Sequence, residues 1–348
     1  MDKNFWQKQI QKHEKLCFLA PMDGYGDSAY RQTMKTIAPH IYCISEFYSA
    51  DGLVHSKFLA DSVLPHQEIE KPLIIQIFGK DLENFAKAAK IIERYNVAGI
   101  DVNMWCPAKK VVRSGHGSSL LINEDLAFQI VDTLNKATKL PISVKTRRSF
   151  DGNQDLVKFA KWLENAGAKL LTIHGRTAAQ AYTGKADFTD IYEVKKHLGI
   201  PVICNGDVMN YDDGMQKVQN LDGFMIGRWS FWNPWCFLGS CHSELDSESF
   251  QKENFLNGIY YPSFEEILDT MLFHATELVK VKWERKWSLE IRKHLVQYLR
   301  NFPNVKEYRK RLVTTESIEN STAVIEELRL KYKKNLDKRP GLGELDEV

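Results

Sequence analysis

Short apolar runs rich in β-branched residues recur eight times in the first two thirds of the chain. They occupy residues 17–22, 40–47, 73–79, 99–104, 142–147, 170–176, 201–207 and 223–228. Most are apolar at nearly every position, which is typical of strands buried on both faces. Stretches of helical period, such as residues 82–95, 125–137 and 155–167, separate most of them. Strand and helix alternating eight times indicate a closed parallel barrel or an open doubly wound sheet.

The residues that end these runs distinguish the two folds, because nearly every run ends in polar or conformationally special residues. They are Pro21, Met22, Glu46, Gln76, Asn103, Lys145, Arg147, His174, Arg176, Asn205, Gly206, Asp207, Gly227 and Arg228. A barrel brings all eight C-terminal strand ends to one mouth, whereas an open sheet needs such residues mainly at its switch point. No Gly-x-Gly-x-x-Gly sequence follows the first run. The pattern therefore predicts an α/β protein with a (β/α)8 TIM barrel.

A different pattern follows Arg228. A Trp-rich stretch (229–237) leads into a polar stretch (240–254) without periodicity. Three stretches of helical period come next, at residues 264–287, 288–302 and 304–332. Pro303 separates the last two, because proline ends a helix. We predict a small C-terminal helical bundle domain after the barrel.

The predicted organisation has four parts. They are a catalytic barrel over residues 1–239, a polar linker or insertion over 240–258, a helical domain over 259–332 and a disordered tail over 333–348.

The bulk composition is that of a globular chain, with 348 residues, 43% hydrophobic and 26% charged. The N-terminal segment lacks an apolar signal region, and no apolar run reaches the about 20 residues that span a bilayer. We therefore expect a cytoplasmic protein with no membrane partner. As a separate expectation, we take the protein to be a monomer. The six cysteines form no Cys-x-x-Cys pair and are too sparse for a disulfide framework.

Charge is unevenly distributed along the chain. The total is +2, but residues 280–311 contain eleven Lys and Arg against three Glu, a net of +8 that leaves −6 for the rest. Such asymmetry suggests that the helical domain has a polyanionic partner.

The ends of the last two predicted strands are candidates for holding a phosphate. Asn205-Gly206-Asp207 and Gly227-Arg228 stand where barrels often bind phosphate, and Arg228 can pair with the anion. The alternative is that these glycines serve only turn geometry. Gln76 and Lys145 favour a phosphate-bearing flavin, since Gln can hydrogen-bond an isoalloxazine edge and Lys can stabilise the reduced anion.

Cys106 follows the fourth predicted strand by two residues and precedes Pro107. One interpretation is a buried structural thiol, which is the expected state of Cys17, Cys43 and Cys204 inside strands. The other is a proton donor at the barrel mouth. That role requires a thiol still protonated near neutral pH.

His174 and Arg176 also have two interpretations. They could be a satisfied core histidine and a structural ion pair. Alternatively, together with Lys145 and Arg147 they form a cationic mouth, which like-charge repulsion makes costly unless an anionic ligand binds there. No His, Cys or carboxylate pair has metal-ligand spacing, so we expect no metal.

Several motifs in fixed order resemble those of the tRNA-dihydrouridine synthases, over roughly residues 16–328. They are APMDGYGDSAYR (20–31), QIFG (76–79), DVNMWCPAKKV (101–111), GHGSSLL (115–121), VKTR (144–147), HGRT…Y (174–182), NGD (205–207), MIGR (225–228) and RKHLVQYLRNFP (292–303).

The resemblance implies an enzyme that reduces the C5–C6 double bond of selected uridines in tRNA, with FMN as cofactor and NADPH as electron donor. By motif, Cys106 would protonate C5 while the flavin delivers hydride to C6, and Asn103, Arg147 and Tyr182 would hold a flipped-out uracil. The residues lining FMN would be Pro21, Met22, Gln76, Lys145, His174, Asn205, Gly206, Asp207, Gly227 and Arg228. The basic helical domain would bind tRNA phosphates.

The chain departs from the family pattern at two places. Trp105 stands where the family usually has Gly before the catalytic Cys, and residues 240–249 resemble an insertion. The alternatives to a tRNA uridine reductase are a flavoenzyme acting on a free pyrimidine or another small enone, and a degenerate barrel that only binds RNA.

Overall fold

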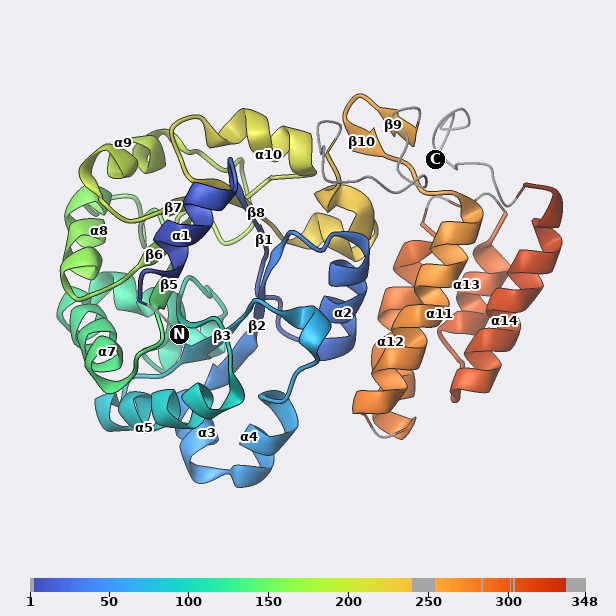
Figure 1. The fold of residues 1–348 in the computed structure, drawn as a ribbon, viewed down its shortest axis with the longest axis horizontal. Helices are drawn as coiled ribbons and strands as arrows, with labels where there is room; N and C mark the ends of the chain where they lie inside the picture. The colour runs from blue at the N-terminus through green and yellow to red at the C-terminus, as the bar shows by residue number, and fades with distance from the viewer. Residues whose placement is uncertain (1–2, 240–253, 283, 301, 303, 336–348) are drawn as a thin grey trace. The chain divides into compact units, whose positions relative to one another are not determined.

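The computed structural model describes residues 3–239, 254–282, 284–300, 302 and 304–335 (Figure 1). The chain divides into two compact units. Unit 1 comprises the described parts of residues 1–26, 41–208 and 214–227, and unit 2 those of 27–40, 209–213 and 228–348.

Unit 1 contains a closed barrel of eight parallel strands, paired in chain order, with β1 also paired to β8. The strands are β1 (Leu16–Leu19), β2 (Tyr42–Ser49), β3 (Leu73–Phe78), β4 (Gly99–Met104), β5 (Ile142–Arg147), β6 (Leu170–His174), β7 (Val202–Asn205) and β8 (Gly223–Ile226). The predicted (β/α)8 barrel is therefore confirmed.

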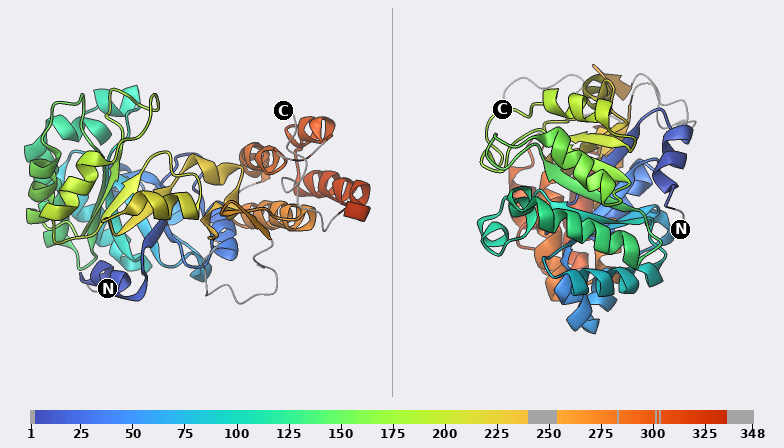
Figure 2. Two further views of the ribbon diagram at one scale, coloured as in Figure 1. Left: turned by 90° about the horizontal axis from the view of Figure 1, so that it is seen from above. Right: turned by 90° about the vertical axis from the view of Figure 1, so that its left-hand side faces the viewer.

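Helices surround these strands in unit 1 (Figures 1 and 2). They are α1 (Phe5–Lys12), α3 (Ala50–His55), α4 (Lys57–Val63), α5 (Leu82–Ile92), α6 (Lys109–Arg113), α7 (Glu124–Ala137), α8 (Leu156–Asn165) and α9 (Thr189–His197), with the 3-10 helices η1 (Glu68–Glu70), η2 (Glu93–Tyr95) and η3 (Gly117–Ile122). Asp81, Asn123 and Asp155 cap α5, α7 and α8 by accepting a backbone N–H with their side chains. These caps explain why the helices begin directly after the preceding loops.

The barrel interior is apolar at one end and polar toward the C-terminal ends of the strands. Leu16, Phe18, Ile74, Leu170 and Met225 belong to one buried cluster, to which Trp6 of α1 contributes from outside the barrel strands. Successive side chains of a strand point to opposite faces, so residues two positions apart point to the same face. A polar residue that comes two positions after one of these apolar residues therefore also points into the barrel. This alternation carries polar side chains toward the barrel mouth.

Unit 2 consists mainly of helices. They are α2 (Ser28–Ile37), η4 (Arg228–Phe231), η5 (Pro234–Phe237), α11 (Phe264–Val281), α12 (Glu284–Tyr298), α13 (Lys306–Leu312), α14 (Ile318–Lys331) and η7 (Lys333–Asn335), with the two-stranded sheet of β9 (Phe255–Leu256) and β10 (Ile259–Tyr260). Helix α10 (Tyr211–Val218) contains the boundary between the units. Ser263 and Glu266 form a reciprocal capping box at the start of α11.

The helical stretches after the barrel differ in detail from the sequence prediction. The predicted helix 264–287 ends at Val281, because Lys282 is extended and its ammonium bonds to Asp27. The predicted helix 304–332 is two helices, since Ser317 caps a new helix with its side chain. Helix α1 was not predicted.

Within the described residues, no helix is long and apolar enough to cross a membrane. The same part of the chain holds no group of three or more His, Cys, Asp or Glu arranged to bind a metal ion. Most of the predicted linker (240–253) and of the predicted disordered tail (336–348) lies outside the described residues.

Candidate functional site

Polar side chains from neighbouring strands lie side by side at the mouth of the barrel. Asn103 of β4 is in register with Lys145 of β5, Arg147 of β5 with His174 of β6, and His174 with Asn205 of β7. All five side chains are buried, between 0% and 7% exposed. The predicted strand-end residues of β4 to β7 therefore do form one group.

Lys145 has a wholly buried side-chain amino group with hydrogen-bond donors to spare. Its Nζ donates to Asn205 Oδ1 at 2.8 Å, and Asn205 Nδ2 in turn donates to the Met225 carbonyl at 2.9 Å. Burial lowers the pKa of Lys145 well below its usual value, Arg147 lowers it further, and Asp101 opposes both. An ammonium has three N–H donors, and the hydrogen bond to Asn205 occupies one of them.

His174 has a defined tautomer. Its Nδ1 accepts the Arg176 backbone N–H at 3.2 Å, so in the neutral ring the hydrogen sits on Nε2. In its neutral form, this ring at the end of β6 can donate only through Nε2.

Arg147 is held by backbone carbonyls from three places in the chain. Its Nε donates to the Trp105 carbonyl, and its Nη1 donates to the carbonyls of Thr177 and Ala181, each at 2.8 Å. Burial lowers the pKa of Arg147 to about 10, which leaves the guanidinium charged at neutral pH. Its Nη2 is buried and has no hydrogen-bond partner within the described residues.

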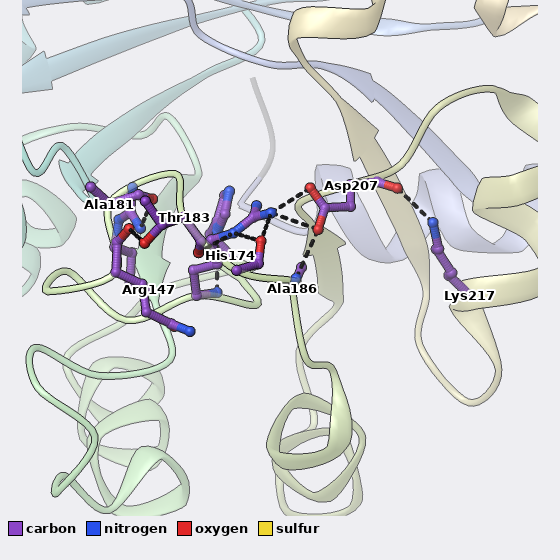
Figure 3. A network of polar contacts seen from close by, with 10 residues as sticks. Arg147, His174, Ala181, Thr183, Ala186, Asp207 and Lys217 are labelled. Carbon is purple, nitrogen blue, oxygen red and sulfur yellow. Dashed lines mark hydrogen bonds and ion pairs between the residues drawn. The ribbon is translucent and has the colours of Figure 1, made fainter.

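Arg176 forms an ion pair with Asp207, whose carboxylate and neighbouring contacts are labelled in Figure 3. Arg176 Nη2 lies 2.7 Å from both oxygens of the Asp207 carboxylate, which also accepts the Ala186 backbone N–H at 2.8 Å. The Asp207 carbonyl accepts a hydrogen bond from Lys217. Asp207, predicted to line the flavin, thus has its side chain engaged within the protein.

Gln76 and Asn103 are joined to each other. Gln76 Nε2 donates to Asp101 Oδ2 at 2.7 Å, and Asn103 Nδ2 donates to Gln76 Oε1 at 3.0 Å. Asn103 Oδ1 accepts the backbone N–H groups of Trp105 and Cys106, at 3.2 and 3.1 Å. Any contact of Gln76 or Asn103 with a ligand would therefore use their second N–H or second lone pair.

Cys106 lies in the segment that connects β4 with α6 (residues 105–108, the Cys106 loop) and is 8% exposed. Burial raises the pKa of its thiol, and the opposing effects of the Ala108 amide and of the Arg147 and Lys145 cations are smaller. The thiol is thus protonated at neutral pH while cations lie close enough to act on it.

Gly117 supports the Cys106 loop from η3. The Ser118 backbone N–H donates to the Cys106 carbonyl at 3.1 Å. Gly117 has φ +61°, and a Cβ built there would lie 2.8 Å from the Cys106 carbonyl oxygen and 2.9 Å from Val111. Only glycine allows this close approach.

Trp105 turns its half-buried indole toward the cations of the mouth. Lys145 Nζ lies 4.0 Å from the ring centroid and the Arg147 guanidinium 5.3 Å from it. The ring is parallel to that of His174 at 6.1 Å, and the edge contact to Tyr182 measures 6.4 Å. Tyr182 is 48% exposed, and Arg147 lies 5.8 Å from its ring centroid.

The remaining predicted flavin residues come from the chain segments at β1, β7 and β8. Pro21 is buried, Met22 packs against the apolar cluster, and Gly206 has φ +111° with His174 close to the position of a Cβ. Gly227 follows β8 in unit 1, whereas Arg228 begins η4 and belongs to unit 2.

The residues of unit 1 fit a bound polar, anionic group. Buried polar atoms without a partner within the described residues include Arg147 Nη2, Arg176 Nη1 and Thr172 Oγ1. Thr172 is in register with Lys145. A buried donor left unpaired costs about 1–3 kcal/mol, so a cluster of them with spare Lys145 donors matches a ligand rich in acceptors, as FMN is.

Sequence reasoning missed Asp101, Ser143 and Thr172, each of which lies two residues before a predicted residue of its own strand. Ser143 Oγ donates to Asp101 Oδ1 at 2.6 Å. A signal was present, because a carboxylate inside an otherwise apolar strand is rarely buried without a partner.

Comparisons with known proteins identify the family of the chain. The sequence matches the family model described as Dihydrouridine synthase (Dus) over residues 18–336. It is 32% identical over 333 residues to the "Probable tRNA-dihydrouridine synthase 1" of Synechocystis sp., covering 92% of this chain and 90% of that protein. It is 35% identical over 291 residues to the "tRNA-dihydrouridine synthase B" of Pasteurella multocida, covering 82% and 85%.

Among solved structures, a complex of 2-naphthoyl-CoA reductase with 2-naphthoyl-CoA is similar in fold, with a TM-score of 0.51 and 10% identity over 64% of this chain and 49% of that one. The likeness at this identity concerns the fold alone. The family match, by contrast, covers nearly the whole sequence. The chain belongs to the dihydrouridine synthase family.

Proposed function

We propose that this protein reduces the C5–C6 double bond of specific uridines in tRNA to 5,6-dihydrouridine. The observation that carries the proposal is Cys106, a thiol that burial keeps protonated close to the Arg147 guanidinium and the Lys145 amino group. Membership of the family and the names of the relatives support it.

The reduction adds one hydride and one proton across the double bond. When bound here and reduced by NADPH, FMN would be the source of the hydride for C6. Cys106 gives its proton to C5 as the electron pair of the double bond moves there, and the resulting thiolate takes a proton from solvent. A proton donor in this position is worth about 10²- to 10⁴-fold in rate.

The other residues bind and orient. Asn103, Arg147 and Tyr182 would hold the uracil, and the unpartnered Nη2 of Arg147 suits one of its carbonyl oxygens. Lys145 and the Nε2 of His174 are donors for the flavin ring. The complete set proposed to line FMN is Pro21, Met22, Gln76, Lys145, His174, Asn205, Gly206, Asp207, Gly227 and Arg228.

The partner is a folded tRNA, whose target base would be extruded into the barrel mouth, as expected for chemistry on a base. Unit 2 supplies phosphate contacts, since Arg300, Lys306, Arg309 and Lys310 are exposed. Such contacts make affinity fall with salt concentration. We place the enzyme in the cytoplasm, where its substrate is made, and expect a monomer that needs no metal.

The test is to mix the purified, FMN-loaded protein with NADPH and tRNA that lacks modifications, and to measure dihydrouridine by mass spectrometry. Free uridine is the control. We expect dihydrouridine in the tRNA and little reduction of the nucleoside. Equal turnover of free uridine would instead favour a reductase of small pyrimidines.

A further inference from the structure

Three buried side chains connect the interior of the barrel to the Cys106 loop. Asp101 and Gln76 are 0% exposed and Asn103 is 1% exposed. Their hydrogen bonds run without interruption from the Asp101 carboxylate through the two amides to the backbone N–H groups of Trp105 and Cys106. We call these three residues the amide relay.

The direction of the amide relay is fixed at both ends. An ionised carboxylate only accepts hydrogen bonds, so Asp101 makes Gln76 turn its NH₂ group inward and its carbonyl oxygen toward Asn103. Asn103 must then turn its own NH₂ group toward Gln76, which leaves its oxygen for the loop amides. These amides can only donate, so every contact in the relay pairs a donor with an acceptor.

We infer that Asp101 is a positioning residue, which orients Gln76 and Asn103 so that Asn103 holds the Cys106 loop in place for proton transfer. The inference rests on the proposed function for the role of Cys106 as the proton donor. It assigns a task to a carboxylate that would otherwise be costly to bury.

Ser143 provides the matched control. It donates to the other oxygen of Asp101 and is buried to a similar degree, but it stands outside the relay. Asp101→Ala removes the acceptor of Gln76, whereas Ser143→Ala removes one hydrogen bond and leaves the relay complete. Asp101→Asn can keep the relay, since its oxygen can accept from Gln76 while the Ser143 hydroxyl turns round to accept from its NH₂ group.

The experiment is hydrogen–deuterium exchange of the FMN-loaded protein at about pH 8, well above the pKa of about 6 to which burial raises Asp101. We expect Asp101→Ala to speed exchange of the Trp105 and Cys106 amides roughly tenfold, the effect of losing about one hydrogen bond. Asp101→Asn and Ser143→Ala should stay within about threefold of the wild type. The inference is overturned if Asp101→Ala leaves the loop unchanged, or if Ser143→Ala speeds it equally.

A second measurement applies if Asp101→Ala does not fold. Asn103→Asp replaces the donor at position 103 by a second carboxylate. Gln76 then lies between two carboxylates, and its amide oxygen must face one of them. Adding Asp101→Asn to this variant should remove that repulsive contact. The new amide at position 101 can then donate to the Gln76 oxygen, and the Gln76 NH₂ group can donate to the new carboxylate at position 103. We expect Asn103→Asp to lower the melting temperature by several degrees and Asp101→Asn to restore most of it.

Relief of a direct repulsion between the carboxylates at positions 101 and 103 would also give such a rescue. The Gln76→Met variant distinguishes this explanation from the relay. Without the Gln76 amide, Asp101→Asn should no longer restore the Asn103→Asp variant. Rescue that persists in the Gln76→Met background overturns the relay. Neither measurement involves tRNA or turnover, so a failure of the proposed function would show in dihydrouridine assays while these results stand.

Discussion

Replacing Lys282 by Met is expected to destabilise unit 2 by about 3 kcal/mol at neutral pH. Lys282 Nζ donates to Asp27 Oδ2 at 2.7 Å and also contacts Glu290. The side chains of Lys282 and Asp27 are 16% and 9% exposed. Asp27 Oδ1 caps α2 by accepting the Tyr30 backbone N–H at 2.9 Å.

The magnitude follows from the pKa of Asp27. Burial alone would raise this pKa, but Lys282, His274 and His294 together lower it to about 2. Against the ordinary value of 3.8, this lowering corresponds to about 2.5 kcal/mol, part of which comes from the two histidines when they are charged. Burial lowers the pKa of His274 to about 4, and that of His294 well below its usual value, so both rings are neutral at pH 7 and Lys282 supplies the positive charge. Breaking a buried pair from one side costs about 3–5 kcal/mol, in agreement.

The pH dependence has a definite sign. The pKa of Asp27 is lower in the folded than in the unfolded state, so its contribution is fully present above about pH 4 and is lost as the pH falls toward 2. The difference between wild type and Lys282→Met should therefore shrink over that range.

The assay is urea unfolding at neutral pH, with hydrogen exchange of α2, α11 and α12 to report on unit 2 itself. The double variant Asp27→Asn/Lys282→Met is the control, because Asn still caps α2 but carries no charge. It should be more stable than Lys282→Met alone. A loss below about 1 kcal/mol in the single variant, or no recovery in the double variant, would refute this reasoning.

Three further predictions concern the barrel mouth and the RNA contact. Gly117→Ala should lower the free energy of urea unfolding by about 1–3 kcal/mol and slow dihydrouridine formation while FMN binding is kept, because its Cβ would press on the Cys106 carbonyl. Unchanged turnover would contradict this. Trp105→Gly should tighten FMN binding to the apoprotein about fivefold in a fluorescence titration, since the indole contacts Lys145, and weaker binding would speak against that competition. Arg309→Gln/Lys310→Gln should weaken tRNA binding and reduce the salt slope of log affinity by about 1–2 in filter binding; an unaltered slope would exclude these exposed side chains from the contact.

The barrel could be predicted from the sequence because strands buried on both faces leave a strong local signal. The run at residues 73–79 is mainly apolar, and the run at residues 142–147 begins with apolar and β-branched residues and ends in Lys, Thr and Arg. Helical stretches alternate with such runs. The observed β3 and β5 match them closely.

The end of α11 could not be predicted because its cause is long-range. Helix α11 ends where Lys282 bonds to Asp27, a residue 255 positions earlier in the chain. No local pattern around Lys282 carries that information.

The site could be predicted only where the order of the strands determines which residues meet. Lys145, Arg147, His174 and Asn205 stand at strand ends, where the fold alone brings them together. The task of Asp101 depends on contacts with Gln76 and Ser143 from two other strands. The position of the Trp105 indole over Lys145 likewise depends on how the loop folds back.

The most direct test of the central claim is the rate at which the FMN-loaded, pre-reduced protein is re-oxidised by unmodified tRNA in a single turnover, followed by flavin absorbance. Cys106→Ala should bind FMN and tRNA as the wild type does but react at least about 100-fold more slowly, because it lacks the proton donor. A Cys106→Ala variant that reacts within about threefold of the wild-type rate would contradict the role of Cys106 as the acid that protonates C5.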